Sequence, residues 1–249
     1  MTRHAGADAP PPPADNVFLA VPHYGALEPE SLPGLMLASQ SRRYTVRLNC
    51  ASLLAHNFNR LLCDALNERR AEGYTHFAMM HADQGPPPGW LDTLIAEMER
   101  VNADVISVAV AIKDGRGLTS TGMRDPRTGD IRRLTTTELH RLPETFAASA
   151  LGDGELMVNT GLWAARFDDW WEDFPGFTIT DAIVKEPDGT FRAGVMPEDW
   201  AFSQWCHNRG LRVFATRAVP VVHYGRSGFA NDRPWGEWLT DKGDRALRG

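Results

Sequence analysis

The stretch "THFAMMHADQGPPPGW", residues 75 to 90, decides the fold. Its apolar run, Phe77 to Met80, is typical of a strand buried on both faces of a sheet. Polar residues begin where such a strand leaves the core, and three prolines then interrupt regular structure. In open α/β sheets the ligand crevice lies beyond the carboxyl ends of the strands. The sequence therefore predicts a site at His81 and Asp83.

The residues around this stretch alternate between strand and helix patterns. "NVFLAV" (16–21), "YTVRLN" (44–49) and "ADVISVAVAI" (103–112) have the composition of strands. Between them, residues 52–71 and 89–102 repeat apolar side chains at helical spacing. A shorter helix is expected near residues 30–40, with Ser31 as its N-cap. This alternation predicts an α/β fold, a mostly parallel sheet with helices on its faces.

The second half of the chain shows a looser pattern. "RDPRTGDIRR" (124–133) predicts a hairpin tip, and "ELMVNTGLWAARF" (155–167) predicts two apolar segments separated by a polar interruption. "PEDWAFSQWCHNRG" (197–210) is typical of a helix, with proline at its start and glycine after its end.

Composition excludes several classes of protein. The 249 residues are 43% hydrophobic and 23% charged, which is ordinary for one globular domain. No apolar run is long enough to span a bilayer, so no integral membrane segment is expected. The formal net charge of −6 disfavours a nucleic-acid acceptor, although it leaves room for a local basic groove.

The cysteines and the amino-terminal residues indicate the cellular compartment. Cys50, Cys63 and Cys206 lack the paired spacing of a disulfide framework or a zinc site, so we expect reduced thiols and a cytoplasmic protein. Residues 1–15 contain a proline run and no segment of signal-peptide type, and are expected to be a disordered lead-in.

Two histidines and an aspartate are the candidate metal ligands. On an extended segment, His81 and Asp83 would point to the same side and could converge on one ion. A mixed nitrogen and oxygen site suits Mn²⁺, a borderline divalent ion. His223 ends another apolar run and is a candidate third ligand. The alternatives are a polar strand end exposed to water and a structural histidine.

Two helical segments carry further candidates. Glu198 and Asp199 lie at a helix start, where they either cap the helix or supply a general base, Asp199. Asn57 and Asn59 flank Phe58 inside a helix, and because Asn is a poor helix-interior residue their amides are expected to be needed. An exposed helix face is the alternative.

In order along the chain, these segments resemble the GT-A glycosyltransferases, particularly the family 2 type and its short phage and bacterial relatives. The resemblance covers roughly residues 16–228. The segments that carry it are "VPHYG" (21–25), "HNFNR" (56–60), "MMHADQGPPPGWLDTL" (79–94), "VNTGLWAAR" (158–166), "MPEDWAFSQWCHNRG" (196–210) and "VVHYG" (221–225).

The resemblance implies a single GT-A-like domain with a Rossmann-like sheet and a smaller antiparallel part on the acceptor side. Residues 16–114 would bind the nucleotide sugar, 115–228 would bind the acceptor, and 229–249 would form a tail that could act as a lid. The donor-binding residues would be Pro22, Tyr24, Asn57, Arg60, His81, Ala82 and Asp83. The acceptor side would include Asn159, Gly161 and Trp200.

The resemblance also implies a metal-dependent transfer of a sugar from a UDP- or GDP-linked donor to an acceptor hydroxyl. His81, Asp83 and His223 would hold the ion, with His81 replacing the family's usual first aspartate and favouring Mn²⁺ over Mg²⁺. Asp199, beside Glu198, would be the general base of an inverting displacement. A silent module that binds nucleotide sugars or glycans, a nucleotidyltransferase, and a retaining enzyme are the alternatives.

Overall fold

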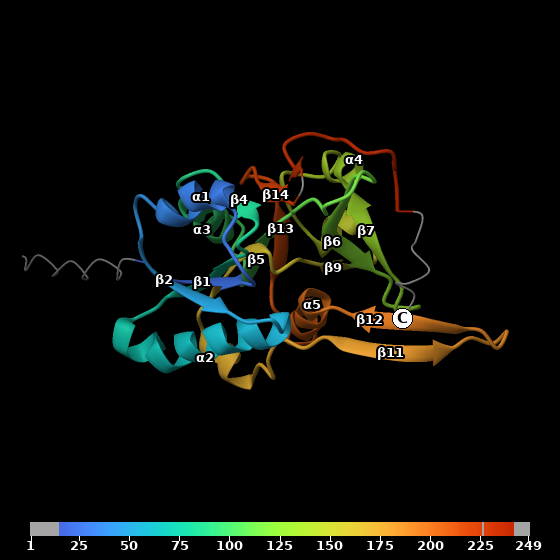
Figure 1. The fold of residues 1–249 in the computed structure, drawn as a ribbon, viewed down its shortest axis with the longest axis horizontal. Helices are drawn as coiled ribbons and strands as arrows, with labels where there is room; N and C mark the ends of the chain where they lie inside the picture. The colour runs from blue at the N-terminus through green and yellow to red at the C-terminus, as the bar shows by residue number, and fades with distance from the viewer. Residues whose placement is uncertain (1–14, 226, 242–249) are drawn as a thin grey trace, which may run out of the picture.

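The computed structural model describes residues 15–225 and 227–241 (Figure 1). Within them, a seven-stranded sheet has the order β2-β1-β3-β10-β5-β13-β8. Its strands are β1 (Asn16–His23), β2 (Arg43–Cys50), β3 (His76–Met80), β5 (Val105–Val108), β8 (Thr145–Ala147), β10 (Leu162–Arg166) and β13 (Val213–Thr216). Strands β10 and β8 run antiparallel to the other five. The expected α/β fold with a mainly parallel sheet is confirmed.

Helices cover both faces of this sheet (Figure 1). In β1, Phe18 and Ala20 belong to a core shared with α2 (Leu54–Glu72) and α5 (Glu198–Asn208). The alternate residues of β1 belong to a second core, shared with α1 (Leu32–Met36) and α3 (Trp90–Arg100). Each central strand is therefore buried on both faces, as its continuous apolar run predicts.

Strand β10 enters the middle of the sheet from the second half of the chain. It pairs antiparallel with β3 on one side and with β5 on the other. Leu162, Trp163 and Ala164 are completely buried. The sequence predicts this apolar segment, but its place between β3 and β5 depends on pairing partners that are distant along the chain.

The ends of two helices show how local sequence sets their bounds. Helix α2 ends at Gly73, which has a φ of 68° and donates its N–H to Arg69 O. Ser31 occupies the N-cap position of α1, as predicted, but its side chain makes no capping hydrogen bond. Ser31 already has a helical conformation, because a 3₁₀ turn (Pro29–Ser31) precedes α1, and its Oγ donates to Glu28 O instead.

Three smaller sheets surround the central one. They are β7-β6-β9, β15-β14-β4 and the hairpin β11-β12. Their strands are β4 (Gln84–Gly85), β6 (Leu118–Arg124), β7 (Ile131–Thr135), β9 (Glu155–Met157), β11 (Thr180–Lys185), β12 (Phe191–Met196), β14 (Val222–Tyr224) and β15 (Gly228–Ala230). The hairpin tip expected at 124–133 is confirmed, since β6 and β7 pair antiparallel across it. A short helix, α4 (Thr136–Leu139), follows β7.

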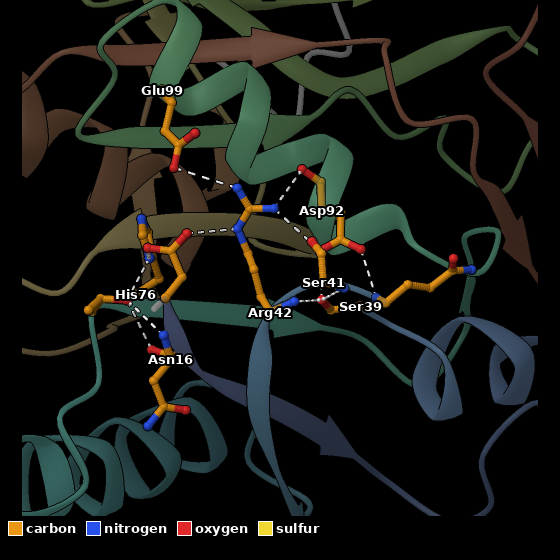
Figure 2. A network of polar contacts seen from close by, with 10 residues as sticks. Asn16, Ser39, Ser41, Arg42, His76, Asp92 and Glu99 are labelled. Atoms are coloured by element: carbon orange, nitrogen blue, oxygen red, sulfur yellow. Dashed lines mark hydrogen bonds and ion pairs between the residues drawn. The ribbon is translucent and has the colours of Figure 1, made fainter. Parts of the chain in front are cut away.

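Arg42 joins the start of β1 to helix α3 (Figure 2). Its guanidinium contacts Asp15 at 2.8 Å, Asp92 of α3 at 3.3 Å and Glu99 at 3.5 Å. Asn16 and His76, which begin β1 and β3, lie beside it in Figure 2. The network therefore lies at the edge of the sheet opposite to the carboxyl ends of β1 and β3.

Other expectations concern the termini, thiols and membranes. Residues 1–14 of the expected lead-in lie outside the described residues, whereas Asp15 bonds to Arg42. Cys50, Cys63 and Cys206 are free thiols, as predicted. In the part of the chain that the structure describes, no helix combines the length and the apolar character needed to cross a bilayer.

Candidate functional site

A cleft of about 360 Å³ opens at the carboxyl ends of β1 and β3. The stretch after β3 forms its floor, with His81, Ala82 and Asp83 among the lining residues. The extended geometry predicted for these residues is wrong, because they form a turn in which Gln84 N donates to His81 O at 3.0 Å. The turn nevertheless places His81 and Asp83 in the same cleft. The volume of the cleft lies within the range of small-molecule sites.

Asp83 is held by two neighbouring side chains. Its Oδ2 lies 2.6 Å from Lys113 Nζ and 3.2 Å from His223 Nε2. Burial alone would raise the pKa of Asp83, but the hydrogen bonds and charges of His223 and Lys113 hold that pKa well below its usual range. Its other oxygen, Oδ1, is buried and has no hydrogen-bond partner among the described residues. The carboxylate is therefore ionised and has one oxygen left to coordinate.

His223 is oriented by the backbone. Its Nδ1 lies 2.8 Å from Ala111 O, and a carbonyl oxygen can only accept, so Nδ1 carries a proton. In a neutral ring, Nε2 would then present a lone pair to Asp83 Oδ2, and such a contact needs a cation or a proton between the two atoms. Metal-ligating histidines commonly have this arrangement, with the second ring nitrogen donating to a carbonyl.

His81 is the third predicted ligand. Burial lowers its pKa to about 4, so the ring is neutral at pH 7. Its Nε2 is buried without a hydrogen-bond partner among the described residues. The ring packs against Phe58, with centroids 5.1 Å apart, and the backbone N–H donates to Gly161 O. A neutral imidazole with a free nitrogen is suited to coordinate a cation.

The nitrogen and oxygen atoms of these three side chains are of the types that bind a divalent ion. The side chains are not, however, arranged as a metal site in this structure. No group of three or more His, Cys, Asp or Glu side chains in the described ranges is close enough to form a ready metal site. Asp83 Oδ1 and His81 Nε2 are nevertheless orphaned polar atoms. Lys113 supplies the positive charge at Asp83 in this structure.

The predicted donor-binding residues divide into two groups. Pro22, Tyr24 and Asn57 line the cleft. The Asn57 amide also accepts from Asn49 Nδ2 and donates to His23 O and Asn49 O, so it fastens α2 to the ends of β1 and β2. Arg60 is exposed and is not among the residues that line the cleft. Its role remains a prediction.

The predicted catalytic pair begins α5. Glu198 is 8% exposed, and burial raises its pKa. Burial, followed by the neighbouring charge of Glu198, raises the pKa of Asp199 to about 7, against the opposing effects of Arg133 and the Trp200 N–H. Asp199 therefore exchanges a proton near neutral pH, as a general base must. It is not among the residues that line the cleft.

The predicted acceptor-side residues are buried, and Asn159 and Gly161 contact the first half of the domain. Asn159 donates through Nδ2 to Val108 O at 2.6 Å, and its Oδ1 accepts from Gly161 N at 2.9 Å. Trp200 is 1% exposed, and Arg133 lies over its ring at 4.6 Å. These contacts give all three predicted residues structural roles, and an acceptor-binding role remains a prediction.

Hydrogen bonds at both ends of the segment 158–161 join α5 to the turn at His81 and Asp83. Ser203 Oγ donates to Asp199 O at 2.8 Å and accepts from Val158 N at 3.0 Å. Three residues later, Gly161 O accepts from His81 N at 2.8 Å. The segment 158–161 therefore connects the helix that carries Asp199 to the turn that carries His81 and Asp83.

Sequence reasoning missed Lys113 and Tyr224. Lys113 follows an apolar run just as His81 does, so the rule about strand ends could have found it. Tyr224 lines the cleft, and its N–H donates to Asp83 O at 2.8 Å. A Cβ at Gly85 would lie 2.5 Å from Tyr224 Cε2, so glycine permits this close approach. No local signal in the sequence indicates that contact.

The described part of the predicted tail packs on the second half of the domain. Trp235 exchanges hydrogen bonds with Thr136, and Arg116 lies over the Trp238 ring at 5.4 Å. Asp241 Oδ2 accepts from Arg133 N at 2.9 Å. Residues 242–249 lie outside the described residues, and a lid function remains a prediction.

Comparison with known proteins supports the fold. No protein family and no curated protein matches the sequence. The crystal structure of A197 from STIV covers 93% of this chain and 98% of its own, with a TM-score of 0.55 and 14% identity. At this identity the likeness concerns the fold alone.

Two enzymes are more distant neighbours. A putative UDP-N-acetylglucosamine pyrophosphorylase from Entamoeba histolytica has a TM-score of 0.40 at 10% identity, covering 81% of this chain and 73% of its own. The nucleoside-diphosphate-sugar pyrophosphorylase from Vibrio cholerae RC9 has a TM-score of 0.37 at 10% identity, covering 80% and 91%. Likeness at this level carries no argument about function.

Proposed function

We propose that the cleft binds a nucleotide sugar and that the protein transfers the sugar to an acceptor hydroxyl. The observation that carries this proposal is the set of groups at the end of β3. A half-buried, ionised Asp83 and Lys113 line a cleft together with Pro22, Tyr24 and Asn57. His223, which is not among the lining residues, contacts Asp83 Oδ2 at 3.2 Å. A cleft with one firmly held carboxylate and adjacent cationic or ligating groups suits a diphosphate that arrives with a divalent cation.

The diphosphate would lie over Asp83, and the base and ribose would lie toward Tyr24 and Asn57. Asp83, His223 and His81 would hold the divalent ion, and their mixed nitrogen and oxygen atoms favour Mn²⁺ over Mg²⁺. Such an ion, when bound, would stabilise the negative charge that develops on the leaving diphosphate. Lys113 would leave Asp83 and contact a phosphate oxygen when the donor binds.

Transfer would proceed by inversion. The acceptor oxygen attacks the anomeric carbon, the bond from that carbon to the phosphate oxygen breaks, and the nucleoside diphosphate leaves with the bonding electrons. Asp199 takes the proton of the acceptor hydroxyl. Its pKa of about 7 is matched to this role near neutral pH. Glu198 contributes by raising that pKa through its own charge.

Nucleotidyl transfer is the second candidate, because it also uses a cation beside a carboxylate to stabilise phosphate charge. The two reactions differ in their products. Glycosyl transfer, including slow transfer to water, releases a nucleoside diphosphate from a nucleotide sugar. Nucleotidyl transfer releases pyrophosphate from a nucleoside triphosphate and a sugar phosphate.

The test measures release of nucleoside diphosphate from UDP and GDP sugars, and release of pyrophosphate from UTP or GTP with a sugar phosphate, each in the presence of Mn²⁺. We expect release of nucleoside diphosphate, and we expect it to be lost in Asp83→Asn. Release of pyrophosphate would instead support nucleotidyl transfer. If neither product forms although donor binding is measurable, the protein is a binding module.

A further inference from the structure

The hairpin β11-β12 protrudes from the body of the molecule (Figure 1). It forms a sheet of two strands, separate from the other sheets of the described residues. An isolated two-stranded hairpin is at best marginally stable in water. Both of its strands are also edges, with backbone groups available to pair. Such an element normally needs a partner surface.

One face of this hairpin is exposed and largely apolar. The register pairs Asp181 with Val195, Ile183 with Ala193, and Lys185 with Phe191, and paired residues share a face. All six are exposed. Ile183 is 81% exposed, Phe191 68% and Val195 41%, which are high values for large apolar side chains. Contiguous apolar patches of this kind mark interaction sites.

The charges on this face indicate which partner covers it. Asp181 lies at the root of the hairpin and Lys185 near its tip, two positions on either side of Ile183. Neither forms an ion pair with another residue in the described ranges, although Lys185 Nζ lies 5.8 Å from the centroid of the Phe191 ring. The face therefore carries a negative end, an apolar middle and a positive end.

We propose that this face binds the same face of a second copy of the chain. A two-fold axis lying between the two hairpins, perpendicular to the strands and level with Ile183, makes facing strands antiparallel. Asp181 of one copy then meets Lys185 of the other, and Val195 meets Phe191. Each contact occurs twice, as an isologous interface requires. The bodies of the two molecules lie at opposite ends of the paired hairpins, so the protrusion of the hairpin gives them room.

The alternative two-fold axis, parallel to the strands, is disfavoured by charge and by steric room. It would place Asp181 at the same level as Asp181 of the other copy and Lys185 at the level of Lys185. It would also bring both bodies to the same end. Charge complementarity and steric room therefore select the same antiparallel arrangement.

The test is sedimentation of the full chain over micromolar to millimolar concentrations. Wild type is expected to dimerise. The single variants Asp181→Lys and Lys185→Asp each place like charges against one another, so each alone should be monomeric. An equimolar mixture of the two variants restores both opposite-charge contacts and should form a heterodimer. Both residues are exposed, so the thermal midpoints of the variants should match that of wild type.

Two further variants complete the design. Ile183→Ser acts on the centre of the interface in both copies and should abolish dimerisation. Arg127→Asp, an exposed charge change on the other hairpin tip, should leave it unchanged. A wild type that stays monomeric overturns the proposal. Single variants that still dimerise also overturn it, and so does a mixture that stays monomeric. None of these outcomes depends on the proposed transfer reaction.

Discussion

Asp83 presents two oxygens with different surroundings, Oδ2 beside Lys113 and His223 and Oδ1 buried without a partner among the described residues. A divalent cation and the Lys113 ammonium would compete for this carboxylate. In the proposed site, the strength of metal binding without donor would therefore be set partly by Lys113, a residue outside the predicted ligand set.

Replacing Lys113 by Met tests this competition. The ammonium lies 2.6 Å from Asp83 Oδ2, so its removal leaves the carboxylate free for Mn²⁺. We expect Mn²⁺ alone to raise the thermal midpoint more in Lys113→Met than in wild type, since a ligand of the folded state stabilises it by mass action. Arg127→Met is the control for loss of one surface cation. An unchanged or smaller Mn²⁺ effect in Lys113→Met would contradict the competition.

Asp199 leads to a prediction about pH. Its pKa is raised to about 7, so it is protonated below that pH and charged above it. The transfer rate should therefore rise with pH and level off above pH 7. Asp199→Asn should remove this dependence together with most of the activity. A rate profile that is flat between pH 5 and 9 in wild type would exclude Asp199 as the base.

The same residue affects stability with the opposite trend. A carboxyl whose pKa is raised on folding binds more protons in the folded state, so its contribution lowers stability as the pH rises from about 4 to about 7. At pH 8, Asp199→Asn removes a buried charge and should stabilise the protein by roughly 1–3 kcal/mol. At pH 4 the gain should vanish. Unfolding in urea at both pH values measures the difference.

At the scale of elements, helix α2 is held by two of its three asparagines, Asn57 and Asn59. Asn59 accepts from Phe177 N at 2.7 Å and donates to Phe177 O at 2.8 Å. Asn59→Ala leaves both backbone groups of Phe177 without these partners and should cost about 1–3 kcal/mol of unfolding free energy. Asn67→Ala, at an exposed position of the same helix, is the matched control and should change stability by less than about 0.5 kcal/mol. Equal effects would show that the Asn59 amide is dispensable.

The elements differ in how far the sequence predicts them. β3, α2 and α3 are predicted because burial, helical spacing and glycine or proline boundaries are local properties. The central position of β10 is not, because it depends on pairing with β3 and β5. The hairpin β11-β12 lacks a pattern of burial, since its large apolar residues face solvent.

In the candidate site, too, local sequence patterns are predicted and contacts between distant residues are not. His81, Asp83 and His223 are predicted as candidates because each follows an apolar run. His81 and Asp83 line the cleft, and His223 contacts Asp83. The turn that replaces the expected extended segment, the close approach of Tyr224 and the ion pair of Lys113 are tertiary contacts. Lys113 and Asp83 are 30 positions apart in sequence and are joined only by the fold.

At the scale of the whole molecule, the sheet brings two chemically distinct regions into one domain. The carboxyl ends of β1 and β3 carry the cleft with Asp83, and α5 carries Asp199 at its start. The buried segment 158–161 connects them through Ser203 and His81. In the proposed reaction, one region would bind the donor and the other would supply the proton acceptor, so binding of the donor is the central requirement of the proposal.

The most direct test is the thermal midpoint of wild type and Asp83→Asn with UDP, GDP, CMP and dTDP sugars, each with and without Mn²⁺. Asp64→Asn, an exposed position on α2, controls for the loss of one carboxylate. We predict that one nucleotide raises the midpoint of wild type and of Asp64→Asn in a Mn²⁺-dependent manner, and that this shift disappears in Asp83→Asn. The account would be contradicted if no donor shifted the wild-type midpoint, or if the shift persisted unchanged in Asp83→Asn.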